Sequence, residues 1–298
     1  MQNLTDSIHG VPKYVNFQFE CSFSLLIPIL PFTYIVPTMV VMWKVFSGYQ
    51  SQPSNFTKLT LDGHLFTLLM LYFVANIAFF FTDLLRFNVP SSGLITSWCA
   101  SLTPNRAFTW LIMIGDYINY CILMLPFLVS LIRIIILKFA YNQHKIRALF
   151  MKWFIFPVLF LVPLSSVSFM FPSIGYCRQL GAPFPFGAID IYYTRGWLGL
   201  RRSYFILALS VACWTLSAIL SSVMYFQIHK SLMYKASAHT RKLARKAELS
   251  ISVTLISAIV PFITNIVVSV TTIWTPNIMF YFTILRIIGV NSQQSKRP

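Results

Sequence analysis

Asp116, Asn119 and Tyr120 share one face of an otherwise apolar stretch, because residues three and four positions apart are neighbours on a helix. Between Arg106 and Arg133, Asp116 is the only charged residue. At 1.5 Å per residue it lies about 15 Å from Arg106 along a helix. A carboxylate at that depth is costly in lipid and must face protein or water. The stretch therefore predicts a membrane-spanning helix whose polar face is turned towards other helices.

The candidate ligand-binding residues are Asp116, Tyr117 and Tyr120. A carboxylate beside aromatic rings can hold a cationic or polar small molecule. The alternative, which the residue types favour, is that Asp116 only satisfies a polar group on another helix. Asp83 is expected to pair with Arg86 three residues further along its own helix, at the membrane interface.

The composition indicates an integral membrane protein built of α-helices. Of the 298 residues, 57% are hydrophobic and 10% are charged, against about 25% charged residues in soluble domains. Six stretches have the length of about 20 residues that crosses a bilayer, namely 23–46, 64–86, 106–137, 150–172, 203–227 and 249–273. We expect an all-α bundle over 23–290, an extracellular N-terminal segment over 1–22 and a polar tail over 291–298.

A weaker apolar run follows the sixth predicted span. Pro276–Gly289 has 14 residues, about 21 Å of helix at 1.5 Å per residue, whereas the hydrocarbon core is about 30 Å thick. Arg286 adds a cost if it lies deep in the membrane. We therefore expect six full spans and a short seventh segment that does not cross, and a chain that signals poorly for lack of a complete seventh helix.

The distribution of the 23 Lys and Arg residues favours an N-terminus outside the cell. With that orientation the inner segments hold thirteen of them and the outer segments seven, the bias that the positive-inside rule describes. This reading assigns the net charge of +16 to topology rather than to nucleic-acid binding. Asn3 also begins an Asn-Leu-Thr glycosylation acceptor, which is usable only outside.

Cys99 and Cys177 fall on the same, oxidising side in this topology, where disulfides persist. A bridge between them is expected, with two free thiols as the alternative. It would tie the 173–202 stretch, which is rich in aromatic residues and prolines, to the start of the third span. That stretch is expected to form an ordered lid, or else a surface loop whose apolar residues dip into the membrane interface.

The sequence contains no catalytic or metal-binding motif. A Gly-rich phosphate loop, HExxH, CxxC and Gly-x-Ser-x-Gly are all absent, and the five histidines lack metal-ligand spacing. We therefore expect no enzyme activity, no cofactor and no metal. A small-solute transporter or channel is the alternative function, but it requires charges on facing helices, and only Asp116 lies deep in a predicted span.

Three patterns carry a resemblance to a known family. They are Leu125-Pro126-Phe127 ahead of Arg133, Pro172–Arg178 running on to Pro183-Phe184-Pro185-Phe186-Gly187, and the opening Ser7-Ile8-His9-Gly10-x-Pro12-x-Tyr14-x-Asn16. Over residues 1 to about 289 the chain resembles the nematode serpentine chemoreceptors of the Srg superfamily, most closely class U. The resemblance implies a seven-transmembrane-receptor-like bundle in the plasma membrane of a sensory neuron, binding a small environmental molecule and coupling to a heterotrimeric G protein.

Two basic features are candidates for G-protein coupling. Arg133 resembles the receptor arginine at the inner end of the third helix, although no Asp or Glu precedes it; the alternative is an arginine that snorkels to the membrane interface. A second group would extend the sixth span into the cytoplasm, where it can dock a G protein or the anionic inner leaflet, or serve topology alone. It consists of Arg241, Lys242, Arg245 and Lys246.

Overall fold

The structure is a computed structural model that describes residues 6–19, 29, 32–50, 63–138, 148–181, 184–194, 196–197 and 202–235. Several sequence predictions lie outside these residues. They are the start of the first span, the sixth span at 249–273, the short segment Pro276–Gly289, the tail at 291–298, the acceptor Asn3, and the basic group of Arg241, Lys242, Arg245 and Lys246.

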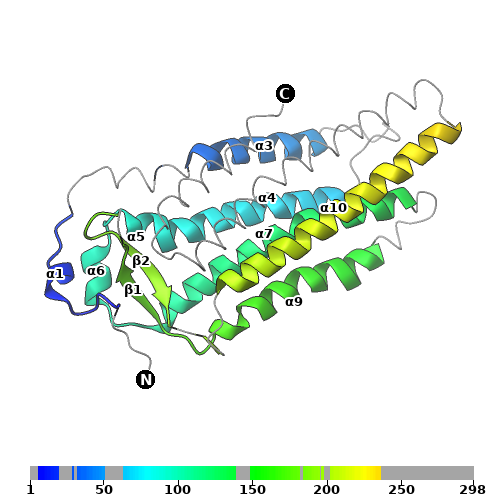
Figure 1. Cartoon of the computed structure of the whole chain (residues 1–298). Coiled ribbons are helices and arrows are strands. Elements are labelled where there is room, and N and C mark those ends of the chain that lie inside the picture. The colour runs from blue at the N-terminus through cyan, green and yellow to red at the C-terminus, as the bar shows by residue number, and fades with distance from the viewer. Residues whose placement is uncertain are drawn as a thin grey trace.

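The described part of the chain contains five long helices that run side by side (Figure 1). These are α3 (Phe32–Gln50), α4 (Gly63–Asp83), α7 (Arg106–Lys138), α9 (Phe156–Val167) and α10 (Arg202–Lys235). Short turns extend two of them. The π-helical turn η2 (Leu84–Asn88) and α5 (Val89–Ser91) continue α4, while η3 (Met151–Ile155) leads into α9 and η4 (Ser168–Met170) ends it.

Four helical segments are long and apolar enough to cross a membrane. They cover Gly63–Ser91, Arg106–Ile136, Ala148–Met170 and Arg202–Gln227. Each begins within two residues of a span predicted from the sequence. The prediction of a mostly helical membrane bundle is confirmed, because runs of about 20 apolar residues satisfy their backbone hydrogen bonds in lipid only as helices or closed barrels.

α7 lies at the centre of the described bundle, in contact with α4, α9 and α10. Among its buried side chains, six recur at every fourth position and form a stripe that winds slowly around the helix. They are Ile112, Asp116, Tyr120, Met124, Leu128 and Ile132, each no more than 5% exposed. Trp110 and Ile114 point away from this stripe and are about half exposed, as side chains that face lipid would be.

An antiparallel hairpin of β1 (Gly175–Gln179) and β2 (Ile189–Tyr193) packs against one end of the bundle (Figure 1). We call this the hairpin end; α6 (Thr96–Ser101) and α1 (Pro12–Val15) also lie there. The all-α fold class therefore needs a correction. The sequence predicted an ordered lid but missed its strands, although the β-branched and aromatic side chains of Ile189–Tyr193 favour a strand.

Glycine allows the hairpin to touch α7 directly. The backbone of Gly175 exchanges two hydrogen bonds with Asn105, of 3.0 and 3.1 Å. A Cβ atom on Gly175 would lie 2.6 Å from the backbone nitrogen of Thr109, closer than side chains pack. On the other side of the hairpin, the N–H of Ile8 donates to the carbonyl of Cys177 at 3.0 Å. The N-terminal segment and α7 thus hold β1 between them.

Candidate functional site

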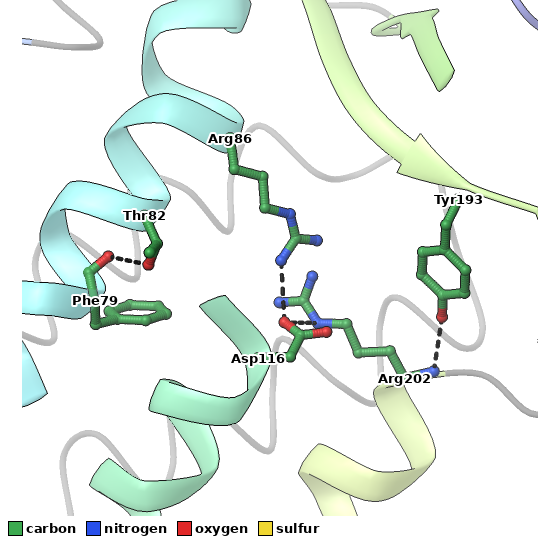
Figure 2. Close-up of polar contacts among 6 residues, drawn as sticks. All are labelled: Phe79, Thr82, Arg86, Asp116, Tyr193 and Arg202. Carbon is green, nitrogen blue, oxygen red and sulfur yellow. Dashed lines mark hydrogen bonds and ion pairs between the residues drawn. The ribbon is translucent and has the colours of Figure 1, made fainter. Parts of the chain in front are cut away.

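Three helical elements meet at Asp116, in the half of α7 that lies nearer the hairpin end (Figure 2). Its Oδ1 accepts a hydrogen bond of 3.0 Å from Nη1 of Arg86, a residue of η2. The same oxygen lies 3.0 Å from Nε of Arg202, the first residue of α10. We call Arg86, Asp116 and Arg202 the Arg–Asp–Arg hub.

The hub is buried and carries one net positive charge, because two guanidinium groups share one carboxylate. The side chain of Asp116 is 1% exposed, that of Arg86 12% and that of Arg202 25%. Charges in such an environment are tolerated only when they are paired. Each arginine thus compensates the buried carboxylate, but the carboxylate compensates only one of the two arginines.

Two further carboxylates face Arg86 from neighbouring elements, Asp83 on α4 and Asp190 on β2. Each has a partner of its own. Asp83 accepts a hydrogen bond of 3.4 Å from Asn88, and Asp190 lies 4.0 Å from Nη2 of Arg178. These acids lower the electrostatic potential around Arg86.

Two tyrosines border the hub. Tyr120 lies one turn along α7 from Asp116, is fully buried, and its hydroxyl has no hydrogen-bond partner within the described ranges. The hydroxyl of Tyr193, on β2, accepts a hydrogen bond of 3.3 Å from the backbone N–H of Arg202 (Figure 2). The hairpin is therefore tied directly to the first residue of α10.

The residues singled out from the sequence fall in two places. Asp116 and Tyr120 lie on the buried stripe of α7, whereas Tyr117 is half-buried and packs against the apolar cluster at the hairpin end. Sequence reasoning missed Arg86 and Arg202 as partners of Asp116. The available signal was that the predicted spans place both arginines at the same end of the bundle as Asp116.

Asp190 is the titratable group of the hairpin with the clearest perturbation. It is 2% exposed, and this burial raises the pKa of its carboxyl above the ordinary value, while Arg86 and Arg178 oppose the change. Arg178 in turn stacks on Tyr192, with its guanidinium carbon 3.7 Å from the ring centroid, a cation–π contact. Arg178 on β1 therefore contacts both a carboxylate and an aromatic ring of β2.

Cys99 on α6 and Cys177 on β1 form a disulfide, with their Cα atoms 6.2 Å apart. Cys121 and Cys213, which lie in helices of the bundle, are free thiols. The disulfide fixes the hairpin to the helix that precedes α7. Together with the backbone bonds to Asn105 and Ile8, it makes the hairpin an ordered cap on this end of the bundle.

The opposite end of α7 carries Arg133. This residue is half-buried, and the structure gives it no hydrogen bond or ion pair with another described residue. It lies seventeen residues from Asp116, which is about 26 Å at 1.5 Å per residue. Within the described ranges no group of His, Cys, Asp and Glu could hold a metal ion.

Comparison with known proteins identifies a family to which this helical bundle belongs. Residues 8–296 match a family described as "Serpentine type 7TM GPCR chemoreceptor Sru". The chain belongs to the Sru family. It is 31% identical over 264 residues to "Serpentine receptor class U-26" of Caenorhabditis elegans, a match that covers 87% of this chain and 88% of that relative. The Sru family is a receptor family rather than an enzyme family, and its members are multi-pass membrane proteins.

Proposed function

We propose that this Sru receptor binds a small environmental molecule at the Arg–Asp–Arg hub and signals to a heterotrimeric G protein at the far end of α7. The observation that carries the proposal is the meeting of η2, α7 and α10 at one buried carboxylate beneath the hairpin. A ligand can shift a conformational equilibrium only if it contacts the two states differently. One that alters these ion pairs changes the contacts of three helical elements at once.

The proposed ligand site comprises Asp116, Tyr117 and Tyr120. We include Arg86 and Arg202 in it, because both form ion pairs with Asp116. Four of these five residues belong to the hub or border it, and Tyr117 lies on the adjacent face of α7. The hydroxyl of Tyr120 supports the proposal because a buried hydroxyl without a partner is costly. A bound molecule that accepts or donates a hydrogen bond there removes that cost.

The proposed coupling surface lies at the other end of the bundle. Within the described ranges, Arg133 on α7 is the residue that we assign to this coupling surface. The basic group Arg241, Lys242, Arg245 and Lys246 completes it on the sequence argument of a cytoplasmic helix extension. Since about 26 Å of continuous helix separates Arg133 from Asp116, α7 can transmit a shift at the hub to the coupling surface.

The proposed topology places the N-terminus and the hairpin outside the plasma membrane of a sensory neuron. Disulfides persist on that side, and the bond from the N–H of Ile8 to the carbonyl of Cys177 holds the N-terminal segment beside the disulfide. Asn3 would then be glycosylated. Digestion with a glycosidase should shift the mobility of the wild-type chain and not that of Asn3→Gln.

The remaining parts of the proposal rest on sequence. They are membership of the wider Srg superfamily, six full spans within a bundle over 23–290, and a short seventh segment at Pro276–Gly289 that does not cross. With the N-terminus outside, six spans return the tail at 291–298 to the outside. An epitope tag after Pro298 should bind antibody on intact cells. Binding only after permeabilisation would show that the seventh segment crosses.

Receptor function can be tested in a cell line that displays the tagged chain on its surface. We would apply a panel of small volatile and water-soluble acids, alcohols and amines, and follow the separation of G-protein subunits by energy transfer. At least one compound should give a dose-dependent response that cells without the receptor lack. Compounds that bind the purified chain but never activate a G protein, and instead cross the membrane faster in expressing cells, would favour a transporter.

A further inference from the structure

We propose that the molecule recognised at the Arg–Asp–Arg hub is an organic acid, whose carboxylate is bound by Arg86 and Arg202 in competition with Asp116. The inference rests on the proposed receptor function and names the chemical class of its ligand. It reverses the charge expected from Asp116 alone, since a lone carboxylate suggests a cationic ligand.

The first observation is the number of hydrogen-bond donors at the hub. A guanidinium group carries five N–H donors. Among the described residues, the side chain of Arg86 uses Nη1, and that of Arg202 makes its ion pair through Nε. Both guanidinium groups are turned towards the same point (Figure 2). They retain donors for a second carboxylate, and arginine recognises carboxylates with two parallel hydrogen bonds.

The second observation is the charge balance. Within the hub, Asp116 neutralises one of the two arginines. Asp190 is paired with Arg178, whereas Asp83 hydrogen-bonds to the neutral amide of Asn88 and keeps its charge near Arg86. An added carboxylate would bring the hub to neutrality. An added ammonium group would face two guanidinium groups in a buried site, where like charges strongly repel each other.

Tyr120 provides an independent third observation. Its hydroxyl is fully buried, has no hydrogen-bond partner among the described residues, and lies within electrostatic range of both Arg86 and Asp116. A hydroxyl can donate to a carboxylate oxygen. Tyr120 belongs to the apolar cluster at the hairpin end, which also contains Phe169 and Tyr193 and suits the tail of an organic acid.

The test measures the thermal stability of the purified full-length chain in lipid nanodiscs with three eight-carbon probes: octanoate, octanol and octylamine. Ligands that bind the folded state raise the melting temperature. Octanoate should raise it most and octylamine least. Tyr120→Phe should weaken octanoate binding about tenfold without lowering the basal melting temperature, because the lost hydroxyl has no hydrogen-bond partner in the part of the chain that the structure describes. The matched control is Tyr204→Phe, a half-exposed tyrosine of α10.

For the variant Asp116→Asn, the direction of the change in probe binding distinguishes a receptor for acids from a receptor for cations. Removing the competing carboxylate should strengthen octanoate binding about tenfold, whereas a receptor for cations would lose octylamine binding. Tighter binding of octylamine than octanoate in the wild type overturns the proposal, as does equal octanoate binding by the wild type and Tyr120→Phe. A shift produced equally by sodium chloride would assign the hub to an inorganic ion and also overturn it.

Failure of this inference differs from failure of the receptor function. If octanol or octylamine activates a G protein and octanoate does not bind, the receptor remains and the ligand class is wrong. If octanoate binds as described but no acid activates a G protein, the ligand class remains and the signalling role is wrong.

Discussion

Arg202 Nε lies 3.0 Å from Asp116 Oδ1, so the first residue of α10 is joined to the first half of α7. Arg202 also donates its backbone N–H to the hydroxyl of Tyr193 on the hairpin. One residue therefore connects the cap to the ion pairs of the bundle. A change at the hub has a direct path to the hairpin as well as along α7.

Replacing Asp116 by Asn should destabilise the fold by about 3–5 kcal/mol, because Arg86 and Arg202 both lose their ion pair to this buried carboxylate. The measurement is the melting temperature in nanodiscs, with the exposed carboxyl variant Asp6→Asn as control. The double variant Arg86→Gln with Asp116→Asn should lose less than the sum of the two single variants, since the residues are in contact. Additive losses would show that the pair contributes no coupling.

The disulfide should link Cys99 to Cys177 in the native protein. Peptide mapping under non-reducing conditions should recover both cysteines in one cross-linked fragment, with Cys121 and Cys213 alkylated as free thiols. Replacing both bridged cysteines by Ser should cost about 2–5 kcal/mol. Alkylation of Cys177 in the native, unreduced chain would refute the bridge.

Gly175→Ala should push the hairpin away from α7, because the new methyl group would meet the backbone of Thr109. Overpacking of this kind typically costs about 1–3 kcal/mol. Gly181→Ala is a matched control on the same loop, where an added Cβ meets nothing within 4 Å. Equal melting temperatures for the two variants would contradict the close packing of β1 on α7.

Asp190 should make the stability of the cap depend on pH. Burial raises the pKa of its carboxyl in the folded state, so ionisation is harder there than in the unfolded chain. Its contribution to stability is then fully present below the unfolded value of about 3.9 and is lost as the pH rises through the folded pKa. Asp190→Asn should remove this dependence. The melting temperature of the variant, measured relative to that of the wild type, should therefore increase as the pH rises. A constant difference would contradict the assignment.

The basic group at 241–246 should be required for coupling and not for ligand binding. Replacing Arg241, Lys242, Arg245 and Lys246 by Gln should abolish G-protein activation, because the positive surface that docks the G protein is lost. Probe binding by the purified variant should equal that of the wild type. If instead the N-terminal acceptor Asn3 loses its glycan in this variant, the four charges serve topology.

The helices were predictable from the sequence because length and hydropathy alone determine which segments can cross a bilayer. The start of α7 at Arg106 and the burial of Asp116 follow from that logic. The hairpin was not found, because two five-residue strands among aromatic residues give a weak signal beside 20-residue spans.

The partners of Asp116 depend on tertiary structure and could not be read from local spacing. The rule for residues three apart favoured Asp83 as the partner of Arg86, whereas the structure places Asp116, thirty positions away, against its Nη1. Arg202 is 86 positions from Asp116 and reaches it only because α10 packs along α7. Sequence reasoning could identify a buried carboxylate but not how many cations surround it.

The central claim is that ligand binding at the hub drives signalling. The most direct measurement is the dose-response of G-protein activation for the strongest agonist of the panel, in cells with equal surface levels of wild type, Tyr120→Phe or Tyr204→Phe. The account predicts that Tyr120→Phe shifts the curve about tenfold to higher concentration, the effect of one hydrogen bond to a charged group, and that Tyr204→Phe superimposes on the wild type. Coincidence of all three curves would contradict it.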